Sequence, residues 1–475
     1  MNIKLNYFIY AAGLLVLIHA SCKTPVISRK MANPSLPSAY INSHDNINDA
    51  IVSWRKFFSD PNLEALIDSA LEHNQELNIT LQEIGMLKNE VNAKRGEYLP
   101  FVTLGSALGP DRAGKYTWNG FSEEDLKQSP DRGPKYIGDF LGVANMSWEL
   151  DVWKKLRNAK QSAMMKYLSS VDAKNFLITN LVSEISSSYF ELLALDNLFE
   201  IIKQNIEIQS NALNAVKLQK DAAKVNQLAV NRFEALLLNT MNLQYEVQQK
   251  ITETENRINF MLGRVPQTVQ RNSTRFNIAN LEVIHAGLPS QLIRNRPDIL
   301  MAEKDLEASK LDVAVAKANF LPSFKLSAGL GFQAFNPIVL LHPESILYNV
   351  VGDVMAPLVN KNAIKAMYYN ANLKQIQSAY NYEMKILNAY VEVINQLNGL
   401  SNYSKSVETK QKEVEILNQS VEISNNLFLS ARADYIEVLL TQREALESKI
   451  ELVEIKLKQM MAKINIYKAL GGGWK

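Results

Sequence analysis

The chain contains one pattern twice. Glu97-Tyr-Leu-Pro100 is followed by the segment FVTLGSALG, and Asn319-Phe-Leu-Pro322 is followed by SFKLSAGLG. A helical stretch precedes each copy, and a second strand-like segment and a very long helical region follow it. The repetition covers most of the 475 residues. It favours one elongated unit built from two similar halves, residues 53–270 and 271–475, over two or three unrelated domains.

The strand-like segments alternate between apolar residues and small or polar ones. In the second copy they cover residues 323–335 and 346–355, and in the first copy about residues 100–108 and 136–150. A period of two predicts strands with one apolar face. Each segment suffices for the roughly 9 to 11 tilted residues that cross a bilayer, and apolar-out, polar-in alternation is typical of a membrane β-barrel. For any one strand alone, a half-buried hairpin in a soluble sheet is the simpler explanation.

Four strands from one chain are too few to close a barrel. An open sheet edge in hydrocarbon leaves backbone N–H and C=O groups unpaired, at a cost of several kcal/mol each. Three copies would supply about 12 strands, which is within the range of bacterial barrels. We therefore expect several copies of the chain to pool their strands.

The helical regions are much longer than those of ordinary enzymes. Residues 143–262 and 400–470 contain neither Gly nor Pro, so no residue in them breaks a helix. Over residues 178–216 apolar side chains recur at alternating spacings of three and four, interrupted only by Ser188 and Gln209. This is a heptad pattern, and the last helical region repeats it. Because Lys, Glu, Gln and Asn occupy the other faces, the pattern predicts coiled coils in water and not membrane-spanning helices.

The composition and the scattered histidines argue against enzymes and nucleic-acid-binding proteins. Lys plus Arg number 51 against 49 Asp plus Glu, so the net charge of +2 gives no reason to expect nucleic acid as a partner. The five histidines lie far apart, and no His/Cys spacing suits a metal. We therefore expect no catalytic residues, no metal and no cofactor.

The N-terminus predicts export and a lipid anchor. Residues 1–21 have an apolar centre, Phe8–Ile18, and end in Ala20-Ser21, as in a signal peptide. The next residue, Cys22, is the only cysteine of the chain and cannot form an internal disulfide. Its position resembles that of a bacterial lipoprotein signal, which implies an acylated cysteine at the mature N-terminus. Residues 22–52 would then form a linker, and such an anchor attaches a protein to one leaflet without spanning it.

Several motifs together resemble one family. They are GLPSQLIRNRPD at residues 287–298, WELDVW at 148–153, the two Leu-Pro motifs and IYKALGGGW at 466–474. From about residue 53 onward, and in this order, they resemble the outer-membrane efflux lipoproteins of the TolC superfamily, NodT branch. Lys154 is a departure, because the family often has Gly after the tryptophan motif.

The resemblance implies an α+β membrane protein. It implies a homotrimer in which each chain gives about four strands to one transmembrane β-barrel, continued by a long α-helical coiled-coil tunnel in the periplasm. The implied function is that of the outer-membrane channel of a tripartite efflux system, a passive conduit for small molecules such as drugs or toxic compounds. The implied partners are a periplasmic adaptor (membrane fusion) protein and an inner-membrane RND pump, in a Gram-negative bacterium.

Two other functions fit the same sequence. One is the outlet of a type I system that secretes polypeptides, and the sequence does not distinguish its cargo from small molecules. The other is a structural coiled-coil lipoprotein that conducts nothing.

Each long helix pair must turn at a tip. The segments most like the family's tips are Lys220–Gln227 in the first half and Leu429–Arg443 in the second. In relatives the second tip carries acidic residues that ring the closed pore. The resemblance thus implies a periplasmic gate near this tip.

Four residues are the candidates for this gate. Glu437 falls on a position that is acidic in TolC itself, whereas Leu440 stands where many NodT-type relatives carry Asp. Asp434 is three residues before Glu437 and would share its helix face. Three copies would bring these carboxylates together, so contacts from Arg432 are expected to hold the closed state. The alternative is a solvated surface pair, the usual state of exposed acidic residues.

Overall fold

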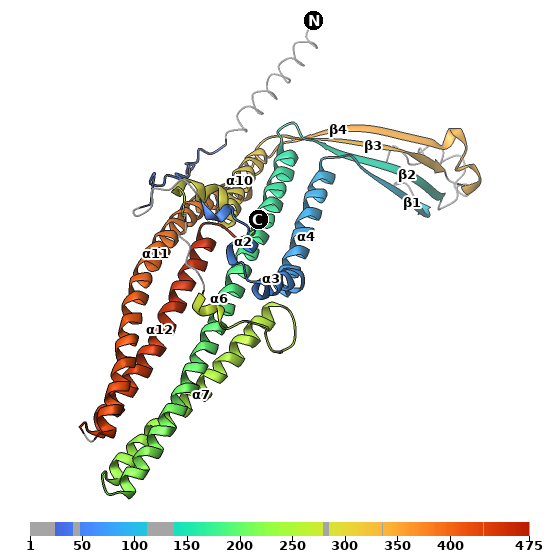
Figure 1. Cartoon of the computed structure of the whole chain (residues 1–475). Coiled ribbons are helices and arrows are strands. Elements are labelled where there is room, and N and C mark those ends of the chain that lie inside the picture. Colours follow the sequence, from blue (N-terminus) through green and yellow to red (C-terminus); the bar gives the residue numbers. More distant parts are fainter. Residues whose placement is uncertain are drawn as a thin grey trace, which may run out of the picture. The chain divides into compact units, whose positions relative to one another are not determined.

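The computed structural model describes residues 24–40, 48–111, 137–278, 285–334, 336–430 and 432–474. The chain forms two compact units. The strand unit comprises residues 1–31, 85–168 and 304–379, and the helix unit comprises residues 32–84, 169–303 and 380–475 (Figure 1). Each unit therefore takes residues from both predicted halves of the sequence. Four helices run from one unit into the other: α4 (Gln75–Glu97), α6 (Lys155–Asp221), α10 (Pro297–Ala318) and α11 (Asn362–Leu429).

The strand unit is built on one antiparallel sheet of four strands in the order β1-β2-β3-β4. The strands are β1 (Phe101–Asp111), β2 (Ile137–Leu150), β3 (Ser323–Ala334) and β4 (Ile346–Met355). All four predicted strands are present. β1 continues three residues beyond the predicted end, because Gly109, Pro110 and Asp111 remain paired with β2. Residues 136 and 335, the predicted ends of two strands, lie outside the described residues.

The strand register gathers the predicted apolar residues on one face of the sheet. Leu104 pairs with Ala144, Ala144 with Leu330, and Leu330 with Tyr348, so one row crosses all four strands. The same face, called the apolar face below, carries Val102, Leu108, Phe140, Met146, Trp148, Leu150, Phe324, Leu326, Ala328, Phe332, Ile346, Val350 and Val354. Many of these side chains are exposed in the single chain, with Leu104 at 87% and Tyr348 at 80%. Water does not solvate such a surface favourably, so it needs an apolar environment.

The opposite face, called the polar face below, is less uniform than the sequence predicted. It carries polar residues such as Asn145, Lys325 and Asn349, together with glycines, but β2 and β4 also place aliphatic residues there. These are Leu141, Val143, Leu347 and Val351. The period-two pattern therefore describes β3 well and describes its neighbours only in part.

Both edges of this sheet are unpaired. β1 and β4 each pair with one strand only within the described part of the chain. Their outer N–H and C=O groups are therefore available to another strand.

A small apolar cluster lies next to the start of β3 in the strand unit. Val313 of α10 and Phe320, two residues after α10, pack with Tyr368 of α11. The rings of Phe320 and Tyr368 meet edge to face, with their centroids 5.7 Å apart. Ile27 of the N-terminal segment packs against this cluster. In the same unit, Asn372 Nδ2 of α11 donates to the carbonyl oxygen of Ser28 at 3.0 Å. The N-terminal segment is thus fixed to the helices that carry the strands.

Two long helix pairs dominate the helix unit (Figure 1). α6 and α11 have 67 and 68 residues, roughly 100 Å each at 1.5 Å per residue. Each pairs with a helix of 35 residues, α7 (Gln227–Met261) or α12 (Tyr435–Ala469). The sequence predicted long helix pairs, but it did not show that one member is about half as long as the other.

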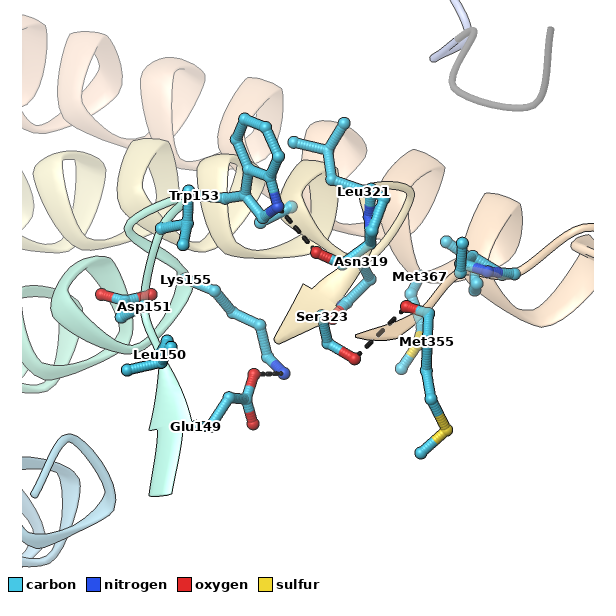
Figure 2. Close-up of a pocket in the computed structure, with 16 residues that line it drawn as sticks. Glu149, Leu150, Asp151, Trp153, Lys155, Asn319, Leu321, Ser323, Met355 and Met367 are labelled. Carbon is cyan, nitrogen blue, oxygen red and sulfur yellow. Dashed lines mark hydrogen bonds and ion pairs between the residues drawn. The ribbon is translucent and has the colours of Figure 1, made fainter. Parts of the chain in front are cut away.

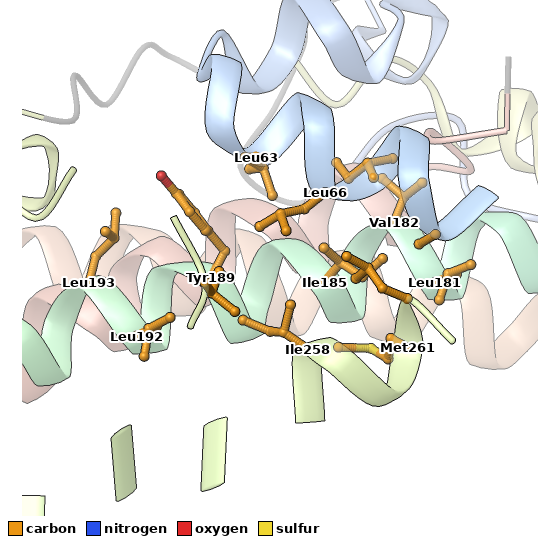
Figure 3. Packing of buried hydrophobic residues seen from close by; sticks show 14 of the residues in the cluster. Leu63, Leu66, Leu181, Val182, Ile185, Tyr189, Leu192, Leu193, Ile258 and Met261 are labelled. Carbon is orange, nitrogen blue, oxygen red and sulfur yellow. The ribbon is translucent and has the colours of Figure 1, made fainter. Parts of the chain in front are cut away.

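The main core of the helix unit lies where α3 (Pro61–His73) crosses α6 and the end of α7 (Figure 3). Leu63 of α3, Ile185 of α6 and Ile258 of α7 are completely buried there. Tyr189 Oη donates to Asp60 Oδ2 at 3.2 Å, and Asp60 also caps the first N–H groups of α3. Burial of the hydroxyl raises the pKa of Tyr189 to about 12, so this contact persists at ordinary pH.

Two of the sequence motifs meet elsewhere in the helix unit. Arg296 is buried and forms an ion pair with Asp298 at 2.8 Å. Its Nη1 also donates to Glu392 Oε2 at 2.6 Å and to the carbonyl oxygen of Ala469 at 2.9 Å. Gly471 has φ +90°, and a Cβ atom there would lie 2.5 Å from the carbonyl oxygen of Asn295. The motifs at 287–298 and 466–474 therefore form one structural clamp, which explains both the arginine and the glycine.

The remaining elements are short. They are η1 (Asp49–Ile51), α2 (Trp54–Phe58), α8 (Arg275–Ile278), η2 (Pro289–Gln291), α9 (Leu292–Asn295), η3 (Pro337–Val339) and η4 (Pro343–Ser345).

In the helix unit the N-terminal segment continues along α11, where Asn33 N donates to Glu383 Oε1 at 2.9 Å and Tyr40 stacks on Tyr390. Within the predicted linker, residues 22–52, the described residues Ile27, Asn33 and Tyr40 therefore contact helices, while others such as Val26 are exposed.

Candidate functional site

The tryptophan motif connects the base of the sheet to the helices. Trp148, near the end of β2, donates its Nε1 hydrogen to the carbonyl oxygen of Tyr98 at 3.0 Å. Trp153 donates in the same way to the carbonyl oxygen of Pro322 at 2.7 Å (Figure 2). Tyr98 and Pro322 belong to the two Leu-Pro motifs that open β1 and β3. The motif at 148–153 therefore holds the residues that precede β1 in the first half and β3 in the second half.

Asp151 of the same motif starts the long helix α6. Its carboxylate accepts hydrogen bonds from the backbone N–H groups of Leu156 at 3.0 Å and Arg157 at 2.9 Å, and from Arg157 Nε at 3.1 Å. Burial alone would raise the pKa of Asp151, but these donors outweigh burial, so its pKa lies below the ordinary value. The carboxylate thus satisfies helix N–H groups that have no partner within the helix.

Lys154 has φ +60°, in the left-handed region. Only glycine adopts this conformation without strain, which explains why the family often has Gly at this position. Next to it, Lys155 Nζ forms an ion pair with Glu149 Oε1 at 2.9 Å beside a cavity of about 540 Å³ (Figure 2). Met355 and Met367 line the same cavity from β4 and α11.

The polar face of the sheet carries two cross-strand rows of polar side chains. Nearer the helices, Glu149 pairs with Lys325 and Lys325 with Asp353, so positive and negative side chains alternate. Toward the middle, Asn145 and Asn349 flank Gly329. These rows would line the water-filled side of any barrel that the sheet helps to form.

The glycines of β3 have a steric reason. A Cβ atom on Gly329 would lie 2.6 Å from Asn349 Oδ1 and 3.1 Å from Asn145 Oδ1. A Cβ atom on Gly331 would lie 2.2 Å from the carbonyl oxygen of Gly142. Glycine therefore allows the side chains and backbone of the neighbouring strands to approach β3 closely on its polar face.

At the other end of the helix unit, the tips of the two helix pairs share one apolar cluster, called the tip cluster below. Leu213 and Val216 of α6, Ala229, Val230 and Phe233 of α7, and Val438 of α12 are all buried in it. The first turn, residues 222–226, contains Ala223 at φ +58°. The described residues of the second turn, 430 and 432–434, follow the end of α11, so both tips fall within the predicted segments.

The structure separates the gate candidates in conformation. The spacing of three residues predicted that Asp434 and Glu437 share a helix face. This prediction is wrong, because Asp434 has extended backbone angles and precedes α12. Glu437 is exposed in the first turn of α12, where the helix dipole favours a negative charge. Leu440 is 43% exposed. Among the described residues, no ion pair links the exposed side chain of Arg432 to either acidic group.

Three further predictions concern Cys22, membrane-spanning helices and metal sites. Cys22 lies outside the described residues. None of the described helices has a stretch long and apolar enough to span a membrane. In the part of the chain that the structure describes, no group of three or more His, Cys, Asp or Glu side chains could hold a metal ion.

A four-stranded antiparallel sheet with an exposed apolar face, together with two long helix pairs, is the arrangement expected of an outer-membrane channel subunit. The chain belongs to the outer membrane efflux protein family, whose sequence profile matches residues 66–264 and 288–472. This is a family of transport proteins and not of enzymes.

Known relatives match over almost their whole length. The chain is 25% identical over 438 residues to the cation efflux system protein CusC of Escherichia coli O6:H1, covering 92% of this chain and 91% of the relative. It is 26% identical over 469 residues to the probable outer membrane lipoprotein SilC of Salmonella typhimurium, covering 97% of each. The fold matches the open state of the Neisseria gonorrhoeae MtrE outer membrane channel with a TM-score of 0.82 at 19% identity, over 95% of this chain and 99% of that one.

Proposed function

We propose that three copies of this chain form the outer-membrane channel of a tripartite efflux system. The observation that carries the proposal is a sheet with a wide, exposed apolar face and two unpaired edges, joined to long helices of which none, among the described residues, could span a membrane. In a bilayer the edges must find partners, because unpaired backbone groups are very costly in hydrocarbon. Pairing β4 of one copy with β1 of the next, three times, satisfies every edge and gives about 12 strands.

Within this trimer the polar face of the sheet lines a water-filled lumen, and the helix pairs continue it into the periplasm. The channel would be a passive conduit for small molecules or ions. Two relatives support this proposal: CusC is a cation efflux system protein, and SilC is a probable outer membrane lipoprotein. The proposed partners are a periplasmic adaptor protein and an inner-membrane RND pump, which supplies the energy.

Edge pairing can be tested with cysteines on the apolar face. Val102 lies at the start of β1, and Val350 and Val354 lie on β4, whose last residue meets the same end of the sheet. Val102→Cys is combined with Val350→Cys or with Val354→Cys. A disulfide requires Cα atoms about 4.4 to 6.8 Å apart, so one pair should give covalent dimers and trimers and the other few. Single-cysteine variants are the controls, and the absence of crosslinks in both pairs would contradict edge pairing.

Conduction is tested with purified trimers in planar bilayers. We expect discrete conducting states, at least after the tips have been opened. If trimers form but never conduct, the structural lipoprotein is the better explanation. Export of a polypeptide, instead of small molecules, by cells that carry this chain and its neighbouring transporter would favour the type I outlet.

Glu437 is proposed to contribute to a ring of three carboxylates at the periplasmic gate, with Asp434 beside it before the helix. Its exposure in the first turn of α12 supports this role. Glu437→Gln should weaken cation preference and block by multivalent cations in single-channel recordings. Unchanged preference and block would place the constriction elsewhere, and Leu440→Ser would then be the next variant.

Acylation of Cys22 is also a proposal. Ile27, five residues later, packs against the helices that carry the sheet, which suits an anchor in the adjacent leaflet. Mass spectrometry of the mature N-terminal peptide should find a lipidated Cys22. Cys22→Ala should abolish the lipid but still allow trimers, because the apolar face inserts independently of it.

A further inference from the structure

Gln209 interrupts the apolar seam of α6 near the tip. It is 1% exposed, and its position follows the three-and-four spacing of the apolar residues around it. Leu213 lies one turn closer to the tip and Val216 nearly one more, and both belong to the tip cluster that joins the two helix pairs. Gln209 therefore lies on the buried stripe of α6, one turn farther from the tip than the tip cluster.

Gln442 has the matching position on α12. It is 4% exposed and lies one turn from Val438, which is the α12 member of the tip cluster. Further along the same stripe, Val453 packs in the main core with residues of α6. Since α6 runs toward the tip and α12 runs away from it, Gln209 and Gln442 each lie one turn from a shared cluster and so at the same level.

Neither side-chain amide has a hydrogen-bond partner. Nε2 and Oε1 of Gln209, and Nε2 and Oε1 of Gln442, are all enclosed without a partner in the described part of the chain. Because their own chain already covers them, another copy of the chain cannot reach them. Other buried polar side chains of these helices do have partners: Gln459 Nε2 donates to Ser404 Oγ at 2.9 Å, and Asn205 Nδ2 to the carbonyl oxygen of Ile201 at 2.8 Å.

We propose that Gln209 and Gln442 form a polar layer that weakens the contact between the two helix pairs and sets how readily the tips part. Enclosed amides without partners are less favourable than hydrated ones, whereas apolar side chains of similar size would favour the closed contact. When the pairs part, water reaches all four atoms. The tip cluster opposes this parting, so the two adjacent layers act in opposite directions on the gate. This inference rests on the proposed channel function.

The test compares full-length trimers of the wild type with Gln209→Leu/Gln442→Leu. The double variant should unfold several degrees higher, because four unsatisfied atoms are replaced by apolar contacts. Its open probability in planar bilayers should fall by about tenfold or more. Hydrogen exchange of residues 438–446 should slow. Greater stability together with less opening is the signature of a closed-state lock, because a merely disruptive substitution would lower stability.

Gln459→Leu is the matched control, since it removes a buried glutamine of the same helix whose amide is satisfied. It should lower stability and leave the open probability unchanged. If branched leucine prevents assembly, Gln209→Met/Gln442→Met repeats the test with unbranched side chains. Unchanged or lower stability with unchanged exchange would overturn the inference. Failure of the wild type to conduct would instead overturn the channel function, while unfolding and exchange would still test the polar layer.

Discussion

Leu330→Arg tests the orientation of the sheet most directly. Leu330 is 62% exposed in the single chain and lies near the middle of β3, between Ala144 and Tyr348 on the apolar face. In the trimer proposed above this face contacts lipid. An arginine near the bilayer midplane costs about 2 to 4 kcal/mol in a barrel, so three copies give roughly 6 to 12 kcal/mol per trimer. We expect the variant to be nearly absent from the outer membrane as a heat-modifiable trimer on semi-native gels.

The control for this substitution lies in the adjacent row. Asn349 pairs with Gly329, the residue before Leu330, so it lies at almost the same depth but on the polar face. Asn349→Arg should assemble nearly as well as the wild type, and Lys325→Ala should be mild for the same reason. Equal assembly of Leu330→Arg and Asn349→Arg would refute the assignment of the apolar face to lipid.

Three further predictions concern the base of the sheet. Lys154→Gly should stabilise the protein by about 1 kcal/mol, because it removes the strain of a left-handed lysine; Lys154→Ala retains this strain and should not, as thermal unfolding will show. Asp151→Asn should destabilise at pH 7, and the difference from the wild type should shrink below about pH 4, because a lowered carboxyl pKa contributes stability that is lost as pH falls through it. Trp153→Phe should cost about 1 kcal/mol of unfolding free energy by removing the hydrogen bond to the carbonyl oxygen of Pro322, and equal stability would show that this bond contributes nothing.

The strands could be predicted because their pattern is local. Alternation along β3 depends only on which face each side chain occupies, and the structure places Leu326 and Leu330 on the apolar face as expected. The pattern is weaker in β2 and β4, where Val143 and Val351 lie on the polar face. A wide lumen does not require every inward side chain to be polar, so alternation alone predicts such strands incompletely.

The tips could not be located from periodicity. The turn between α6 and α7 contains neither Gly nor Pro, and Ala223 adopts the left-handed conformation there. Only the resemblance to known relatives indicated this segment. The helix start at Tyr435 also could not be predicted, and it removes Asp434 from the helix face that its spacing to Glu437 implied.

The contacts of the candidate site were missed because they are distant in sequence. Trp148 and Trp153 are five residues apart, yet their indoles bind carbonyl groups that belong to different halves of the chain. A signal was present, since tryptophan is rare here and occurs twice in one motif beside two Leu-Pro motifs. Gln209 was visible only as a break in a heptad seam, and Gln442 carried no signal in the sequence, because only packing shows that its amide is enclosed.

The chain reverses its apolar face at the base of the sheet, and this explains why the tryptophan motif is placed there. Along the strands most apolar side chains lie on the apolar face, which contacts lipid in the proposed trimer, whereas along the helices the buried apolar side chains lie in the seams between helices. The reversal occurs between Leu150, the last residue of β2, and Lys155, the first of α6. Indoles suit this boundary because they combine an apolar ring with one N–H donor, and Asp151 supplies the charge that starts a helix in water. Trp148 and Trp153 thus suit the boundary between the apolar surroundings of the strands and the aqueous surroundings of the helices, and Asp151 suits the start of α6.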